Sequence, residues 1–363
     1  MPSWDTQRYF MPLLREHIAL TPTSRVLELG FYDPEAALWA AREGAEVLAL
    51  RPTVDQVTEL DRRAREAGLP NLEARLALHI EPAERGRFDL ALLLVPYFLG
   101  NAPSREAIDV AAGGLTPGGQ LAFQVHYRHG GRTFVKHAAT RFSAVAFLGM
   151  GGGQRRLYRA AGPLATAAGQ SLQPEPAALL EVTLRGVALR LRLAAGVFAS
   201  KGIDPATRLL LQTAELPPAA RVLDLGCGAG TIGLALAAAD PRAFVVLVDS
   251  SRPAVDLARE NAALNNVRNV DLRLDDGYRA VPGERFDAIL SNLPAHRGHQ
   301  ADAAVAERFI VEAPAYLRED GSAWFVANRA LPYELPASRA FRQVRLAASD
   351  GRYKVLHCSG PRQ

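Results

Sequence analysis

The stretch RVLDLGCGAG at residues 221–230 decides the fold, because a short apolar strand runs there directly into a glycine-rich loop. A related phrase, RVLELG, stands much earlier in the chain at residues 25–30. Two further pairs follow in the same order: RFDLALLLVP at 87–96 with RFDAILSNLP at 285–294, and LTPGGQLAFQV at 115–125 with LREDGSAWFVAN at 317–328. Collinear matches of this kind indicate a duplicated domain.

The composition fits two ordinary globular domains, since 363 residues exceed the usual size of one hydrophobic core. A hydrophobic content of 48% with 22% charged residues is typical of a soluble protein, and no apolar run is long enough to span a membrane. The start of the chain lacks the pattern of a signal peptide. The two cysteines, Cys227 and Cys358, are too few for a disulfide framework or a zinc cluster. We therefore expect a cytoplasmic protein with no membrane segment and no metal site.

Both halves alternate short apolar runs with helical patterns. Strands are predicted at 25–30, 45–50, 88–95 and 119–125 in the first half, and at 221–225, 244–248, 270–274, 286–290 and 324–327 in the second. The second half adds a strand or hairpin within 180–193 and a final antiparallel pair near 343–347 and 353–358. This order predicts an α/β fold of two tandem Rossmann-like domains with doubly wound, mostly parallel sheets. We place the domains at 1–160 and 180–363, joined by a linker at 161–179.

Only the second copy keeps residues that could carry chemistry. Its glycine loop holds Gly226, Gly228 and Gly230, which let the backbone turn sharply and approach a ligand. Carboxylates follow its strands at Asp224, Asp249, Asp275 and Asp276, and SNLPAH (291–296) ends the fourth strand. Because the carboxyl ends of parallel strands share one edge of a sheet, we expect these residues to converge there. The loop alone also fits a dinucleotide fingerprint, so an NAD-linked oxidoreductase stays open at this point.

The first copy has lost this set of residues. Glu28 stands where the second copy has Asp224, but FYDPEA at 31–36 supplies no glycine loop. The later strand ends in VPYF at 95–98 and offers no asparagine amide. We predict that the first domain cannot bind the ligand of the second and serves support or recognition.

The phrases VLDLGCGAG, VDSS, LDDG and FDAILSNLPAHRG, in this order, resemble the class I S-adenosylmethionine-dependent methyltransferases. More narrowly, GVFASKGIDPATRLLL at 196–211 and VANRALPYE at 326–334 are similar to the tandem-domain ribosomal RNA guanine-N2 methyltransferases. Those enzymes pair a degenerate amino-terminal methyltransferase-like domain with an active carboxyl-terminal one. The resemblance implies transfer of a methyl group from S-adenosylmethionine to the exocyclic N2 amine of a guanine in ribosomal RNA.

The resemblance also implies roles for single residues. Asp224 and the loop from Gly226 to Gly230 would hold the methionine end of S-adenosylmethionine, and Asp249 would accept hydrogen bonds from both ribose hydroxyls. Asp275 or its neighbour Asp276 would meet the adenine. Two further residues are expected to border the cofactor: Phe198 and Asn292.

Asn292 is the catalytic candidate. Its side-chain carbonyl and the backbone carbonyl of Leu293 could accept the two hydrogens of the target amine and so position it for attack. The family pattern is asparagine, proline, proline and an aromatic residue, often followed by histidine. Leu293 here replaces the first proline, which would fix the backbone, and Ala295 replaces the aromatic residue, which would stack on the base. Pro294 remains, and His296 or Phe198 could replace the missing ring.

A basic segment in the first domain indicates the partner. No acidic residue stands between Asp109 and Glu175, and such a one-signed stretch suits a phosphate backbone, although composition alone could produce it. The candidate contacts to RNA are Arg128, Arg132, Lys136, Arg155 and Arg156, with Arg297 from the second domain. We expect a monomer whose partner is ribosomal RNA or a ribosomal subunit. Two alternatives stay open: an inactive RNA-binding assembly factor, and a methyltransferase acting on protein glutamine or a small molecule.

Overall fold

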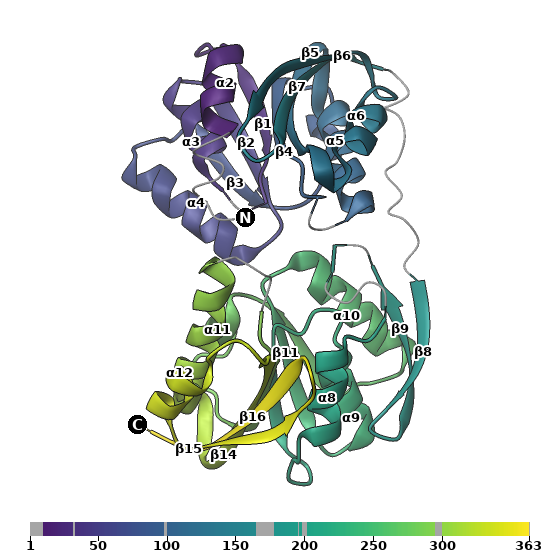
Figure 1. Ribbon diagram of the computed structural model, residues 1–363, viewed down its shortest axis with the longest axis vertical. Coiled ribbons are helices and arrows are strands. Elements are labelled where there is room, and N and C mark those ends of the chain that lie inside the picture. Colours follow the sequence, from purple (N-terminus) through teal and green to yellow (C-terminus); the bar gives the residue numbers. More distant parts are fainter. Residues whose placement is uncertain are drawn as a thin grey trace. The chain divides into compact units, whose positions relative to one another are not determined.

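The structure, a computed structural model, describes residues 10–31, 33–97, 100–164, 178–194, 196–197, 202–294 and 300–362. The chain divides into two compact units, Met1–Pro176 and Ala177–Gln363. Each unit contains a seven-stranded sheet with helices packed on it, and the second unit adds a two-stranded hairpin (Figure 1). The predicted α/β class with two doubly wound sheets is therefore confirmed.

The first unit is built on a sheet with the strand order β3-β2-β1-β4-β5-β7-β6. Strands β1 to β5 run parallel, and β7 pairs antiparallel with both β5 and β6. Its elements are α2 (Met11–His17), β1 (Arg25–Leu29), α3 (Glu35–Arg42), β2 (Glu46–Arg51), α4 (Val54–Glu66), β3 (Leu72–Leu76), β4 (Phe88–Leu94), α5 (Asn101–Gly114), β5 (Leu115–His126), α6 (Arg132–Ala138), β6 (Phe142–Gly151) and β7 (Arg155–Pro163).

The second unit repeats this topology with the order β12-β11-β10-β13-β14-β16-β15. Its elements are β8 (Ala178–Leu184), β9 (Val187–Leu193), α8 (Pro205–Thr213), β10 (Arg221–Leu225), α9 (Thr231–Ala239), β11 (Phe244–Asp249), α10 (Arg252–Leu264), β12 (Val270–Leu274), β13 (Phe286–Asn292), α11 (Gln300–Glu312), β14 (Leu317–Asn328), α12 (Glu334–Ala340), β15 (Phe341–Ser349) and β16 (Tyr353–Pro361). The expected hairpin within 180–193 is the β8–β9 pair, and the final antiparallel pair is β15–β16.

The borders of the predicted linker fall inside strands. Strand β7 continues to Pro163 and β8 begins at Ala178, so the range 161–179 was too wide at both ends. Residues 165–177 lie outside the described part of the chain.

The two units also share a hydrogen bond at the first residue of β1 and of β10. In the first unit the backbone N–H of Arg25 donates to Asp89 at 3.0 Å. In the second the backbone N–H of Arg221 donates to Asp287 at 2.7 Å. Each aspartate is the second residue of its strand, β4 or β13, and belongs to the repeated RFD phrase, so the duplication extends to single hydrogen bonds.

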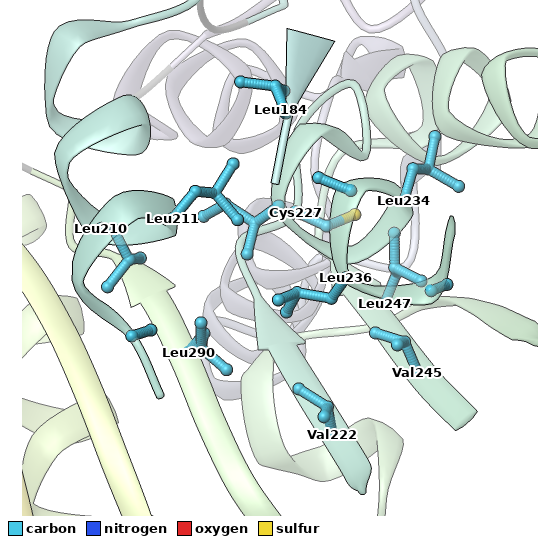
Figure 2. Close-up of a cluster of buried hydrophobic side chains, with 14 of the residues drawn as sticks. Leu184, Leu210, Leu211, Val222, Cys227, Leu234, Leu236, Val245, Leu247 and Leu290 are labelled. Atoms are coloured by element: carbon cyan, nitrogen blue, oxygen red, sulfur yellow. The ribbon is translucent and has the colours of Figure 1, made fainter. Parts of the chain in front are cut away.

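One face of the second sheet is covered by α8, α9 and α10, and strand β9 of the hairpin packs against α9 and α10. Figure 2 shows this cluster, in which Leu184 of β8, Leu210 of α8 and Val222 of β10 pack with Cys227 of the glycine loop. Burial raises the pKa of the Cys227 thiol well above its usual value. Cys227 therefore fills space beneath the loop as a small apolar residue.

Candidate active site

The glycine loop between β10 and α9 has the backbone that only glycine adopts easily. Gly226, Gly228 and Gly230 have φ values of +70°, +54° and +82°. The backbone N–H groups of Gly226 and Cys227 both donate to the carbonyl of Val248, at 2.9 and 3.0 Å. Among the described residues, a Cβ added to Gly226 would meet only Phe309, at 3.9 Å. This is the close approach of backbone to ligand that glycine permits.

Asp224 lies at the base of this loop and is fully buried. One carboxylate oxygen, Oδ2, accepts from the backbone N–H of Gly233 at 2.8 Å, whereas Oδ1 has no hydrogen-bond partner among the described residues. Burial, and after it the charge of Asp249, raises the pKa of Asp224 to about 7. Because buried polar atoms are normally paired, the orphaned Oδ1 fits a site that receives a donor or a cation from a ligand.

Asp249 ends β11 beside the loop, and two backbone groups fix its carboxylate. Oδ2 accepts from the N–H of Gly228 at 2.9 Å, and Oδ1 accepts from the N–H of Ser251 at 2.8 Å. Both oxygens are thereby fixed at the carboxyl end of β11, next to the glycine loop. This arrangement suits a pair of neighbouring hydroxyls such as those of a ribose.

The adjacent carboxylates Asp275 and Asp276 have different roles. Arg308 on α11 donates with both terminal nitrogens to Asp276, with Nη1 at 2.8 Å from Oδ2. Asp275 instead accepts from the backbone N–H of Asp276 at 2.7 Å, and its nearest cation, on Arg279, is 4.0 Å away. Asp276 is thus occupied by a bridge to α11, and Asp275 is the better placed of the two for a ligand.

Asn292 ends β13 with its amide held in one orientation. Its Nδ2 donates to Asp204 Oδ2 at 2.9 Å and to Thr207 Oγ1 at 3.0 Å. Asp204 is in turn the N-cap of α8 and accepts from the backbone N–H of Thr207 at 3.2 Å. Since both amide hydrogens point to these acceptors, the side-chain carbonyl Oδ1 remains available to accept from a ligand.

Sequence reasoning had given no role to Asp204 or Thr207. The one local signal was the Asp-Pro pair at the start of a helix, which N-capping already explains. Their contact with Asn292 joins positions 88 and 85 residues apart, so it depends on the tertiary fold.

Leu293, where the family pattern has proline, is fixed by a different means. Its side chain is buried, and its backbone N–H donates to the carbonyl of Val326 on β14 at 2.9 Å. Proline could not make that hydrogen bond. A strand contact thus constrains the backbone at Leu293, where the family pattern relies on the proline ring. The side chains of Phe198, Ala295, His296 and Arg297 lie outside the described residues.

The corresponding edge of the first unit is closed by an ion pair. Arg51 occupies the register position of Asp249, and its Nη1 donates to Glu28, the counterpart of Asp224, at 2.5 Å. Both side chains are buried. A Cβ added to Gly30 would collide with the guanidinium of Arg51. The guanidinium thus fills the space above the strand end that the glycine loop leaves free in the second unit.

The structure exposes most of the described residues that were predicted to contact RNA, but it buries one of them. Arg128, Arg132 and Lys136 are exposed, and Arg156 lies with its guanidinium carbon 3.7 Å from the centre of the Tyr127 ring. Arg155 is only 7% exposed. It begins β7, which pairs on both sides within the sheet, so its assignment as a phosphate contact is wrong.

Comparison with known proteins identifies relatives over both units. The family described as Methyltransferase small domain matches residues 188–357. The ribosomal RNA small subunit methyltransferase C of Hamiltonella defensa is 37% identical over 45% of this chain and 48% of its own length. The ribosomal RNA large subunit methyltransferase G of Ectopseudomonas mendocina is 33% identical over 80% of this chain and 75% of its own length. The chain thus matches about half the length of some curated relatives and three quarters of another.

A solved structure matches nearly the whole chain. The T. thermophilus 16S rRNA N2 methyltransferase, solved in complex with AdoMet and guanosine, is 25% identical, covers 96% of this chain and 91% of its own, and has a TM-score of 0.80. Within the described residues, no helix is long and apolar enough to cross a membrane. In the same part of the chain, no three acidic, histidine or cysteine side chains gather as a metal site would require.

Proposed function

This chain belongs to the class I methyltransferase family that includes ribosomal RNA methyltransferases C and G, and we propose that it methylates the N2 amine of a guanine in ribosomal RNA. The methyl donor is S-adenosylmethionine. The observation that carries the proposal is the amide of Asn292, held by two acceptors so that its carbonyl oxygen is left for the substrate.

The cofactor is held by the residues around the glycine loop. The orphaned oxygen of Asp224 receives the amino-acid end, with the backbone from Gly226 to Gly230 in close approach. Asp249 accepts from the ribose hydroxyls, and Asp275 meets the adenine. When bound, S-adenosylmethionine supplies an electrophilic methyl group on a sulfonium centre.

Catalysis rests on positioning the target amine. The lone pair of an exocyclic amine is delocalised into the ring, so the amine is a poor nucleophile. Asn292 Oδ1 and the backbone carbonyl of Leu293 accept its two hydrogens and orient the lone pair away from the ring plane. Fixed acceptors of this kind lower the barrier without reorganisation during the reaction. The amine proton leaves after methyl transfer, when the nitrogen has become acidic, so no strong base is required.

The first unit contributes recognition. Its exposed cations Arg128, Arg132 and Lys136 suit the phosphate backbone of ribosomal RNA or of a ribosomal subunit. Arg156 has its guanidinium over Tyr127 and adds a planar cation. We place the protein in the cytoplasm, acting as a monomer.

The test is methyl transfer from labelled S-adenosylmethionine to ribosomal RNA from cells that lack the protein, offered both as free RNA and as assembled subunits. Mass mapping should find N2-methylguanine at one position. Asn292→Ala should abolish transfer while calorimetric binding of S-adenosylmethionine survives. Label that appeared on protein glutamine, or S-adenosylmethionine that failed to bind, would favour the alternative substrate or the inactive assembly factor respectively.

A further inference from the structure

The first unit carries an aromatic and basic cluster at the edge where the second unit has Asn292. Strand β4 leads into Tyr97, and β5 ends at His126, from which an irregular turn, Tyr127–Gly131, leads into α6 (Figure 1). We call the following residues the edge cluster: Tyr97, His126, Tyr127, Arg128, His129, Arg132 and Arg156. In the duplicated phrases, VPY at 95–97 aligns with LPA at 293–295. The edge cluster therefore occupies the strand end that bears the catalytic candidate in the other copy.

Three rings of the edge cluster pack together, and two of them are stacked. The rings of Tyr97 and His129 are nearly parallel, with centroids 4.9 Å apart and an interplanar angle of 10°. His126 packs against both, with its centroid 4.4 Å from His129 and 5.3 Å from Tyr97. His129 is exposed, whereas Tyr97 and His126 are half-buried. The stacked pair of Tyr97 and His129 thus ends at the surface in the ring of His129, on which another planar group could be placed.

The other half of the edge cluster supplies positive charge. Arg132 donates from Nε to the hydroxyl of Tyr127 at 2.6 Å, and the guanidinium of Arg156 lies over the ring of the same tyrosine. Arg128, next to His129 in the turn, is exposed. Burial first, and then the charges of His129, Arg155 and Arg128, lower the pKa of His126. The turn therefore has a positive electrostatic potential.

Two further features show that the turn is specialised. His129 has φ −111° and ψ 58°, and Gly130 has φ 82°. The backbone is therefore not helical at these two residues, which lie just before α6. Among the described residues, His126 Nδ1 and Arg156 Nε are buried polar atoms without a hydrogen-bond partner. Orphaned polar atoms in a native structure call for an explanation, and they set this turn apart from ordinary surface structure.

We propose that the edge cluster binds one unpaired nucleotide of the substrate RNA, with its base stacked on His129 and its flanking phosphates held by Arg128 and Arg132. Stacking of a base on a ring tolerates any sequence, and guanidinium forks match phosphate. Double-stranded RNA hides its base faces, so the site selects an unpaired segment. This inference rests on the proposed function, because it takes RNA to be the substrate.

The test measures binding of the full chain to labelled RNA by fluorescence anisotropy, with a short single strand, the same strand carrying abasic positions, and a blunt duplex. His129→Ala should weaken binding of the single strand about tenfold and leave the abasic strand and the duplex unchanged. Phe147→Ala removes an exposed ring from β6 of the same sheet and serves as the matched control, with no effect expected. Arg128→Gln with Arg132→Gln should reduce the salt dependence of binding.

Separate readouts keep this site distinct from the proposed activity. Equal single-strand binding by His129→Ala and the unaltered protein would overturn the site, even if methyl transfer to ribosomal RNA were intact. Binding of heparin as tightly as of the single strand would also overturn it, because only a polyanion surface would then exist. Conversely, the predicted loss in His129→Ala in a protein that transfers no methyl group to RNA would uphold the site and reject the proposed function. Thermal melting of each variant checks that it folds.

Discussion

Asp224 is a buried carboxyl whose protonation should depend on the cofactor. Its pKa of about 7 lies above the usual 3.8, so the folded protein holds a proton there that the unfolded chain releases. Without cofactor, the contribution of Asp224 to folding stability is therefore greatest below pH 3.8 and falls as the pH rises to about 7. The folded protein without ligand favours the protonated form of Asp224. A positively charged ligand beside it lowers the pKa and favours the carboxylate instead.

We accordingly expect S-adenosylmethionine binding near pH 6.5, just below the pKa of about 7, to release a proton from Asp224. Calorimetry in buffers of different ionisation enthalpy measures this release directly. Asp224→Asn, which cannot titrate, should remove the proton release and flatten the loss of apo-protein stability between pH 4 and pH 7. Binding enthalpies that were independent of the buffer in the unaltered protein would contradict the assignment.

Asp204 should act on catalysis through Asn292. Asp204→Ala removes the acceptor that holds the Asn292 amide and also the N-cap of α8. We expect kcat to fall on the order of 100-fold, because the substrate acceptor loses its orientation, with S-adenosylmethionine affinity unchanged. Loss of the N-cap of α8 should also lower the free energy of unfolding by about 1 kcal/mol.

The conservative variant separates positioning from folding. Asp204→Asn keeps an oxygen that can cap α8 and accept from Asn292, so most of kcat should return. Thr207→Ser keeps the second acceptor of the amide, whereas Thr207→Val removes it without changing the shape of the side chain. Single-turnover kinetics that were equal in Asp204→Ala and the unaltered protein would show that Asn292 needs no such support.

At the scale of elements, the β8–β9 hairpin is tied to the glycine loop through one side chain of α10. Asn261 is fully buried, and its Oδ1 accepts from the backbone N–H of Arg192 on β9 at 2.7 Å. Its Nδ2 donates to the carbonyl of Ala229 in the loop at 2.9 Å. Asn265, one turn later, accepts from the backbone N–H of Arg190 at 2.8 Å but is partly exposed, and it makes no hydrogen bond to the loop among the residues that the structure describes.

Replacing these two asparagines should therefore have unequal effects. Asn261→Ala leaves buried backbone groups of β9 and of the loop unpaired, so we expect a loss of about 2 kcal/mol or more in unfolding free energy and weaker S-adenosylmethionine binding. Asn265→Ala removes the matching contact on the same strand and should cost less than about 1 kcal/mol, with binding unchanged. Denaturant unfolding and calorimetry measure both; similar binding by the two variants would show that the hairpin does not support the loop.

The elements that the sequence predicts well are those with uninterrupted apolar runs. Strands β10 and β12 have the expected bounds, and β13 extends only two residues beyond them, to Asn292. Strand β3 was not predicted because LEARL mixes charged and apolar residues and is mostly half-buried. The β6–β7 pair lies in a stretch rich in glycine and arginine that gives no clear period. Long-range partners, such as Val326 for Leu293, have no local signal.

At the scale of the whole molecule, the duplication has preserved supports and replaced functional groups. Asn71 donates to the carbonyls of Ala41 and Ala45 in the first unit, at 2.8 and 2.7 Å. In the second, Asn269 donates to the carbonyls of Ala237 and Ala243, at 3.0 and 2.8 Å. These asparagines precede β3 and β12 and fasten the same turn. The strand ends have diverged instead. Glu28 and Arg51 pair with each other in one copy, whereas Asp224 and Asp249 accept from the backbone N–H groups of Gly233 and Gly228 in the other.

This division predicts how the two units unfold. The contacts of the chain separate into two compact units, so we expect two denaturant transitions. Arg51→Ala leaves Glu28 buried without its partner and should destabilise the first unit by about 3 kcal/mol or more. The double variant Glu28→Leu with Arg51→Met removes both charges and should regain most of the lost stability.

S-adenosylmethionine at a hundred times its Kd should raise the unfolding free energy of the second transition alone, by about 2.7 kcal/mol. Fluorescence-monitored unfolding with and without the cofactor separates these effects. If a single transition were observed and both Arg51→Ala and the cofactor shifted it, the two units would unfold together. The Glu28–Arg51 pair of the first unit would then contribute to the stability of the second unit.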